Sequence, residues 1–389
     1  MPTTLMGLDR AREIYSDRSQ RAKELRRNGK KITGYICLYP VIEMITAADS
    51  VPYRIFGDLR EPITKADSHM ATVVCSFMRS CLDIGLKGRY DFLDGVVFAH
   101  VCDVTCMIPG IWRQTIPTKY THFIDTPHTL HPSSREYFRT LLDDFRVTLE
   151  AYTGVKLTPE RLKKAIQLHN TQRALVRELY EMKKPDPPLL SGVETLIVLK
   201  AIMSLPVEEG NNLLREVIQE VKTRHNTLTK KKARLLVWGS VLDDTAFIDM
   251  IESLDANVVI DDTCVGSRAY FNDVPMTSNP MDGLAQYYLS DIKCPRTVKE
   301  AEHGGKRKDY KADLEARFGY LKEYTRDWNV NGVILQSLRY CDGHGYEVPG
   351  LKDYFEDLGL PSIYLEHDYS VAALAPLRTR VQGLTEIIG

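Results

Sequence analysis

The sequence predicts an α/β protein made of two Rossmann-like or flavodoxin-like parallel-sheet domains, which form a pseudo-repeat and are joined by a helical segment. Two distant stretches, 94–103 and 331–342, carry the clearest evidence. Each has a small polar residue and Gly, then an apolar run, then Cys-Asp. A short apolar run opened by Gly is typical of a buried strand. Open α/β sheets bind ligands just beyond such strand ends. Two thiols at equivalent strand ends therefore indicate a shared metal site.

The length of 389 residues allows two to three domains. A hydrophobic content of 43%, a charged content of 26% and a net charge of -1 are ordinary for a soluble globular chain. These values give no reason to expect a nucleic-acid or membrane partner. Charged residues begin at Asp9, so the N-terminus lacks the apolar core of a signal peptide. No run is apolar enough to span a membrane, and we expect a cytoplasmic protein.

The first half of the chain alternates predicted strands and helices. The order β-α-β-α-β favours a parallel sheet with helices on both faces. The expected strands are 34–38, 51–56 and the run that ends before Cys102, and the expected helical stretches are 8–30, 41–49 and 66–86.

The second half repeats this order after a helical stretch. The expected strands are 234–239, 257–261, the run before Cys341 and 362–366, and the expected helices are 243–254, 281–292, 307–329, 349–358 and 376–388. Residues 134–227 show helical pattern throughout, broken at 185–188 by Pro-Asp-Pro-Pro. The predicted organisation is an N-terminal α/β domain at 1–133, a helical connecting segment at 134–228 and a C-terminal α/β domain at 229–389. No phosphate-binding loop motif is present, so this chain should not hydrolyse ATP by itself.

The eight cysteines include no CxxC pair, and in a reducing compartment they are not expected to form disulfides. Four of them lie at or just beyond predicted strand ends: Cys37, Cys102, Cys264 and Cys341. Thiolates with no nearby His pair favour an iron–sulfur cluster over zinc. Such a cluster needs at least three cysteines. With Cys102 and Cys341 as two ligands, the residues alone leave Cys37, Cys75 and Cys264 all eligible as the third.

Several segments together resemble one known family, the D-component family of 2-hydroxyglutaryl-CoA dehydratase. The segments are Gly34-Tyr-Ile-Cys-Leu-Tyr39 followed by Glu43, Cys75-Ser-Phe-Met-Arg79, the strand that ends at Cys102-Asp103, Tyr340-Cys341-Asp342, Ile363-Tyr-Leu-Glu366-His-Asp368 and Leu377-Arg-Thr-Arg380. They follow the family order over nearly the whole chain. Two positions depart from the family pattern: Pro40 comes one residue early, and Asp49 replaces a glycine.

The resemblance implies a [4Fe–4S] cluster between the two α/β domains, held by Cys75, Cys102 and Cys341 with one iron position left open. It also implies a heterodimer with a homologous, cluster-bearing partner, and a separate ATPase with its own iron–sulfur cluster. ATP would act only through that ATPase, and the substrate would be an acyl-CoA.

Within the family, the segments around Tyr53 and 261–268 look more like subunits of ATP-dependent benzoyl-CoA reductase than like the dehydratases. We therefore expect reduction of an aromatic acyl-CoA thioester, with His100 as proton donor beside a ligand cysteine. Glu43 is a second catalytic candidate, and Tyr39 and Arg268 are candidate substrate contacts, Arg268 through a phosphate of coenzyme A. A 2-hydroxyacyl-CoA dehydratase subunit, a double-cubane cluster reductase and a non-catalytic electron relay remain as alternatives.

Overall fold

A computed structural model describes residues 6–224, 228–302 and 309–389 of the chain. It contains two four-stranded sheets, and all their strand pairs are parallel. The first sheet has the order β2-β1-β3-β4 and the second β6-β5-β7-β8. The strands are β1 (Lys31–Tyr35), β2 (Ser50–Arg54), β3 (Gly95–Ala99), β4 (Tyr120–Ile124), β5 (Ala233–Gly239), β6 (Ala256–Asp262), β7 (Gly332–Leu338) and β8 (Ser362–His367). The prediction of two parallel-sheet α/β units is confirmed.

Both sheets reverse their strand order at the same place. In each, the chain first adds a strand on one side and then returns to add the next two on the other side. The reversal lies between β1 and β3, where Tyr35 pairs with Val97, and between β5 and β7, where Trp238 pairs with Leu335. Ligand crevices of doubly wound sheets form outside the strand ends at such points. The positions after these strands are therefore the natural place for a site.

The helices divide into three sets along the chain. The first set is α1 (Gly7–Ser16), α2 (Ser19–Arg27), α3 (Ile42–Ala47), the 3₁₀ turn η1 (Ala66–Ser68), α4 (Ser76–Leu86) and α5 (Asp103–Thr115). The middle set is α6 (Pro132–Thr153), α7 (Pro159–Glu181), α8 (Gly192–Ile202) and α9 (Val207–Thr223). The last set is α10 (Thr245–Glu252), η2 (Ser267–Ala269), α11 (Pro280–Gln286), the π-helical turn η3 (Tyr287–Asp291), α12 (Tyr310–Asp327), α13 (Asp342–Gly345), α14 (Val348–Asp357), η4 (Val371–Leu374) and α15 (Ala375–Ile388).

The structure corrects the predicted elements at several places. The expected helix 66–86 is broken, because residues 69–75 are not helical and α4 begins only after Cys75. The first strand comes three residues earlier than predicted, which leaves Cys37 two residues beyond its end. Sequence patterning missed β4 altogether: it is an edge strand whose first four side chains are only half-buried, so it lacks a continuous apolar run. The predicted helix start at Arg307 lies outside the described residues.

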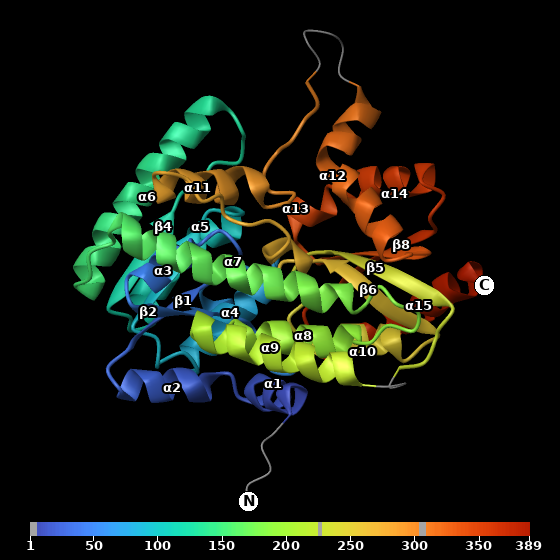
Figure 1. Cartoon of the computed structure of the whole chain (residues 1–389), viewed down its shortest axis with the longest axis horizontal. Coiled ribbons are helices and arrows are strands. Elements are labelled where there is room, and N and C mark those ends of the chain that lie inside the picture. Colours follow the sequence, from blue (N-terminus) through green and yellow to red (C-terminus); the bar gives the residue numbers. More distant parts are fainter. Residues whose placement is uncertain (1–5, 225–227, 303–308) are drawn as a thin grey trace, which may run out of the picture.

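The middle helices pack against both halves of the molecule. Helix α7 packs on α3 of the first half, and α8 packs on α10 and β6 of the second. Figure 1 shows α7, α8 and α9 lying side by side across the region where the two sheets meet. Contact with both halves lets these helices fix the two halves relative to each other. The boundaries expected at residues 134 and 228 stay a prediction.

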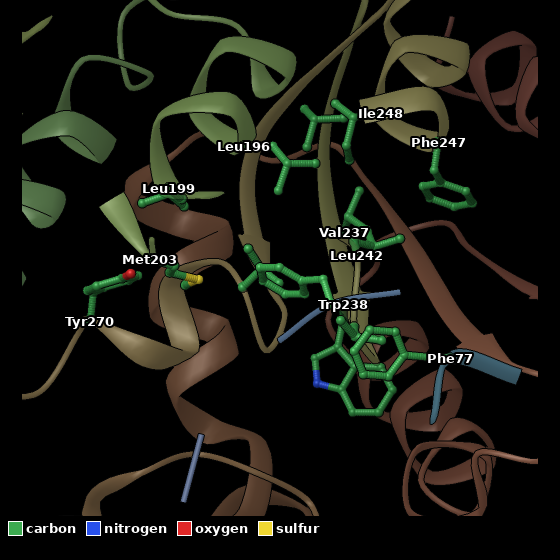
Figure 2. Packing of buried hydrophobic residues seen from close by; sticks show 14 of the residues in the cluster. Phe77, Leu196, Leu199, Met203, Val237, Trp238, Leu242, Phe247, Ile248 and Tyr270 are labelled. Carbon is green, nitrogen blue, oxygen red and sulfur yellow. The ribbon is translucent and has the colours of Figure 1, made fainter. Parts of the chain in front are cut away.

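One hydrophobic core runs through both halves. Its members include Phe77 of α4, Trp238 of β5, Leu199 of α8 and Met203, which follows α8, and Figure 2 shows part of this cluster. Trp238 is fully buried and sits at the carboxyl end of its strand. Because the two halves share this core, packing holds one sheet in a defined position relative to the other.

Asp49, which departs from the family's glycine, has a φ of 58°, in the left-handed region that favours glycine. Asp tolerates this conformation better than most residues do, and Asp49 forms an ion pair with Lys30 at 2.7 Å. The substitution is therefore compatible with the turn between α3 and β2. In the described part of the chain, no helix combines the length and the apolar character that crossing a bilayer requires.

Candidate functional site

Three cysteines, which we call the first thiol group (Cys75, Cys102 and Cys341), share one local geometry. Each is the N-cap residue of a helix: α4 for Cys75, α5 for Cys102 and α13 for Cys341. Backbone N–H groups of the first helical turn, those of Met78, Thr105 and His344 among them, lower the pKa of the respective thiol, although burial raises it by more. Such N–H groups favour a thiolate over a thiol. The three helix starts are therefore suited to hold three negatively charged sulfurs.

The sulfurs of the first thiol group are close enough to affect one another's ionisation. Burial, followed by the negative charge of Cys102, raises the pKa of Cys75 to about 11. Burial and the charges of Cys75, Cys264 and Cys102 raise the pKa of Cys341 well above its usual value. Thiolates crowded in this way need a compensating positive charge, which a metal centre supplies.

A second set of cysteines, the second thiol group (Cys37, Cys264 and Cys294), lies buried or half-buried close to the first. A hydrogen bond from Cys37, helped by Arg268 and Arg54, lowers the pKa of Cys264 to about 6, although burial opposes this shift. The charge of Cys264 also raises the pKa of Cys294, after the larger effect of burial. Cys37 has a φ of 71°, an unusual conformation for a residue with a side chain. The two groups together comprise six of the eight thiols, and the charge of Cys264 acts on Cys341 across them.

Arg268 and His344 connect the two groups. Arg268 Nη1 lies 3.6 Å from Cys264 Sγ and 2.9 Å from His344 Nε2, and His344 Nδ1 lies 3.4 Å from Cys341 Sγ. The Arg268 side chain is fully buried and ion-paired with Asp262. It therefore has no free surface for a coenzyme A phosphate, and the expected phosphate contact is not what the structure provides.

His100, the expected proton donor, follows β3 and remains partly exposed, with its side chain 27% accessible. Its Nδ1 lies 2.6 Å from Asp125 Oδ1, and its ring lies edge-to-face with that of His128. Burial, followed by the charges of Arg296 and His100, lowers the pKa of His128 to about 4. A carboxylate on Nδ1 orients an imidazole and leaves Nε2 to exchange a proton. Asp125 could not be identified from sequence patterning, because it follows the unpredicted strand β4.

Glu43, the second catalytic candidate, is fully buried in α3. One carboxylate oxygen is ion-paired with Arg173, and the other accepts a hydrogen bond from Tyr288 at 2.7 Å. Burial raises the pKa of Glu43, but Arg173 and His169 more than offset that effect and hold it below the usual value. Both oxygens are occupied, and the group stays ionised. We therefore assign Glu43 to the fold and not to the chemistry.

Tyr39, an expected substrate contact, is also fully buried. The guanidinium of Arg296 stacks on its ring at 4.3 Å, and its hydroxyl lies 3.4 Å from Thr297 Oγ1. These contacts tie the turn after β1 to the loop after η3. The tyrosine is enclosed by protein, so a substrate cannot reach it in this conformation.

Two spaces lie beside the thiol groups. A cavity of about 50 Å³ borders Cys37 and is lined by Arg54, Arg173, Tyr270 and Tyr287, among others. It has room for a few water molecules. A groove of about 900 Å³ lies between the two halves. Its lining includes Ser76, Arg79, Arg339 and Tyr340. Two of these residues, Ser76 and Tyr340, are the chain neighbours of Cys75 and Cys341, so the groove lies next to the loops that carry two cysteines of the first thiol group.

The remaining cysteines have different surroundings. Cys81 is fully buried inside α4, and Cys106 is exposed on α5, one turn after Cys102. Helical geometry predicts that Cys75 and Cys81 cannot both face one site. Cys75 caps the helix, whereas Cys81 lies within it and packs in the hydrophobic core.

The donor set suits an iron–sulfur cluster better than a single ion. Among the described residues, no group of three or more His, Cys, Asp or Glu side chains is arranged to hold one metal ion. Thiolates that share one tetrahedral zinc lie roughly 4 Å apart, whereas the ligands of a cubane are spread around a larger body. Three thiols at three helix starts, without a histidine pair, fit the second arrangement.

Comparison with known proteins gives a consistent picture. The sequence model of a family described as 2-hydroxyglutaryl-CoA dehydratase, D-component, matches residues 37–388. A benzoyl-CoA reductase subunit of Thauera aromatica is 26% identical, over 92% of this chain and 91% of that protein. The (R)-phenyllactyl-CoA dehydratase beta subunit of Clostridium sporogenes is 23% identical over 94% of both chains. The lactoyl-CoA dehydratase beta subunit of Anaerotignum propionicum is 24% identical over 92% of both.

Proposed function

Because the chain belongs to the 2-hydroxyglutaryl-CoA dehydratase D-component family, we propose that it is the iron–sulfur subunit of an ATP-dependent, benzoyl-CoA-reductase-type enzyme. The observation that supports this proposal is the first thiol group, in which three cysteines from the two halves each occupy the N-cap position of a helix and influence one another's pKa. In the proposed enzyme, Cys75, Cys102 and Cys341 hold a [4Fe–4S] cluster between the halves. Such a cluster, when bound, passes single electrons at low potential.

The proposed reaction reduces the aromatic ring of an acyl-CoA thioester. Two electrons, delivered one at a time, and two protons convert the ring to a cyclic diene. The groove beside Ser76 and Tyr340 gives the thioester a path to the first thiol group. Cys75 is buried and Cys341 is half-buried, which limits the access of water that would otherwise quench a radical.

His100 is the proposed source of a proton. It lies two residues from Cys102, is partly exposed, and has its Nδ1 held by Asp125. Its Nε2 can therefore give up a proton while the Asp125 carboxylate stabilises the ring orientation. A second proton comes from solvent through the same exposed edge.

The proposed assembly contains further subunits. The relatives described above are named as subunits of larger enzymes. By analogy we propose a homologous cluster-bearing partner and a separate ATPase that carries its own iron–sulfur cluster. ATP hydrolysis in that ATPase would supply the driving force, consistent with the lack of a phosphate-binding loop in this sequence.

One observation favours a second candidate, a reductase with a double-cubane cluster. The second thiol group offers three more cysteines, and Cys264 lies close enough to Cys341 to raise the pKa of Cys341. Two adjacent sets of three thiols match the ligand count of two joined cubanes. Iron content separates the candidates directly.

The test begins with iron and sulfide assays of anaerobically purified protein. We expect about four iron atoms per chain, with loss of the cluster in Cys102→Ala and Cys341→Ala but not in the matched control Cys81→Ala. About twice that iron, sensitive to Cys37→Ala, would select the double cubane. Protein without iron, or a cluster that survives loss of Cys341, would overturn the proposal.

A second experiment identifies the reaction. The reconstituted complex with its ATPase and a reductant is incubated with benzoyl-CoA or with a 2-hydroxyacyl-CoA. Formation of a dienoyl-CoA supports the reductase. Loss of water from the hydroxyacyl group instead would assign the chain to a dehydratase.

A further inference from the structure

A chain of hydrogen bonds runs from Asp262 through Arg268 and His344 to Cys341. Arg268 Nη1 contacts His344 Nε2 at 2.9 Å, and His344 Nδ1 contacts Cys341 Sγ at 3.4 Å. The same Nη1 lies 3.6 Å from Cys264 Sγ. One buried cation therefore touches a sulfur of the second thiol group directly and a sulfur of the first through an imidazole.

The direction of each bond follows from chemistry alone. A guanidinium can only donate, so His344 Nε2 must accept and carries no proton. The neutral ring then bears its proton on Nδ1, and this N–H can only donate to Cys341 Sγ. The tautomer of His344 is thus set by Arg268.

Arg268 is itself held on several sides. Its Nε and Nη2 donate to the two carboxylate oxygens of Asp262, each at 3.1 Å, and Nη1 also donates to the Gly239 carbonyl. Tyr320 donates to Asp262 at 2.7 Å, and the Trp238 ring lies 5.3 Å from that of His344. Asp262, Arg268 and His344 are all buried. The arrangement leaves neither Arg268 nor His344 room to turn.

We propose that His344 is a positioning residue, locked by Arg268 in the Nδ1–H tautomer, that donates a hydrogen bond to the Cys341 sulfur and links it to Cys264. The inference rests on the proposed function and deepens it, because a donor to a ligand sulfur stabilises the reduced form of an iron–sulfur cluster and makes its reduction potential less negative. Negative charge added near Cys341 would also change the electrostatic environment of the Cys264 sulfur, because Arg268 contacts both His344 and Cys264.

The first test needs no cluster. The reduced, cluster-free protein is labelled with ¹⁵N-histidine for long-range ¹⁵N–¹H correlation spectra. One of the signals of the Nδ1–H tautomer should be missing from the spectrum of His344→Asn. In Arg268→Gln, if that variant folds, the same ring should change its tautomer distribution. An Nε2–H or doubly protonated His344 in the unaltered protein would overturn the proposal, whatever the variants do.

The second test measures the potential of the loaded protein by EPR-monitored redox titration. His344→Leu removes the donor and should shift the potential to more negative values at unchanged iron content. His344→Asn restores an N–H near the position of Nδ1 and should recover at least half of that shift. The control His122→Leu alters a histidine of β4 that is bonded to Thr148 instead, and it should leave the potential unchanged. Equal potentials in the Leu and Asn variants would overturn the tuning role.

The two tests also separate the two proposals. If the protein binds no iron, the proposed function fails, while the spectra of the cluster-free protein still decide whether the hydrogen bond exists. If iron binds normally and the tautomer is wrong, only the positioning role is lost.

Discussion

At the scale of single residues, surroundings and not residue type distinguish the cysteines. Cys264 has a hydrogen bond from Cys37 and two nearby guanidinium groups, and its pKa falls to about 6. Burial, followed by the charges of Asp243 and Cys75, raises the pKa of Cys81 well above the usual value. The same side chain is thus a thiolate at one position and an inert hydrophobe at another.

Glu43 gives a prediction about stability. Glu43→Gln leaves the Arg173 guanidinium buried without its counter-ion and should lower the free energy of unfolding by roughly 3–5 kcal/mol, measured by urea denaturation. The matched control Asp282→Asn breaks a surface pair with Arg139 and should cost far less. Equal losses in the two variants would contradict a structural role for Glu43.

The same ion pair predicts a pH dependence. The pKa of Glu43 is lower in the folded state than in the unfolded state. Its contribution to stability is therefore fully present above the unfolded pKa of about 4.3 and is lost as the pH falls through the lower folded value. The difference in unfolding free energy between the unaltered protein and Glu43→Gln should shrink across that acid range.

His100 gives a prediction about catalysis. If it supplies a proton, His100→Gln should reduce the rate of product formation by about 10²-fold or more, with iron content and cluster spectrum unchanged. Asp125→Asn, which loses the carboxylate at Nδ1, should give a smaller loss in the same assay. Full activity in His100→Gln would remove this residue from the mechanism.

At the scale of elements, the same local arrangement, a cysteine at the N-cap position of a helix, occurs at α4, α5 and α13. The cysteine ends a loop, a helix follows, and backbone N–H groups of its first turn lower the pKa of the thiol. At α5 this start is reinforced by Thr105, whose hydroxyl accepts the N–H groups of Val101 and Cys102 at 3.0 and 3.1 Å. The cap therefore also positions the cysteine.

Thr105 tests this arrangement. Thr105→Val keeps the shape and removes the acceptor, so unfolding free energy should fall by about 1 kcal/mol and the cluster should be lost faster in the presence of an iron chelator. Thr105→Ser retains the hydroxyl and should behave almost like the unaltered protein. If Val and Ser variants release iron at the same rate, the cap does not position Cys102.

At the scale of the whole molecule, the first thiol group exists only when the halves are packed together. Cys75 and Cys102 belong to the first half and Cys341 to the second. Tyr369, after β8, links the halves: its N–H donates to Ser76 Oγ beside Cys75, and its ring packs edge-to-face on that of Phe77 in α4. The hydroxyl holds this side chain in place, because it lies 2.7 Å from both carboxylate oxygens of Asp243 in its own half.

Tyr369 therefore gives a prediction about the contact between the two halves. Tyr369→Phe leaves buried Asp243 with fewer donors and should lower the free energy of unfolding by about 1–3 kcal/mol; chelator-induced release of iron should also quicken. The control Tyr364→Phe removes a hydroxyl bonded to Ser337 on β7 of the second half, and it should not affect iron release. An unchanged rate of iron release in Tyr369→Phe would show that the contact of Tyr369 between the halves does not influence the first thiol group.

Much of the fold could be predicted from the chain alone, because buried strands leave continuous apolar runs. The edge strand β4 has no such run and was not predicted. Asp125, the partner of His100, follows that strand and was missed for the same reason. The buried positions of Tyr39, Glu43 and Arg268 could not be foreseen either, because a polar residue in a short segment looks the same whether its partner is solvent or a distant side chain.

Local periodicity and strand direction are enough to predict the two parallel sheets, their repeated order and the cysteines just beyond several strand ends. Which thiols share an environment depends instead on how the two halves pack together. Cys294 joined Cys37 and Cys264, Cys81 entered the core, and Arg268 became the link to His344 instead of a phosphate contact. The physical reason is that ionisation and hydrogen bonding depend on neighbours far apart in the chain, which only packing brings together.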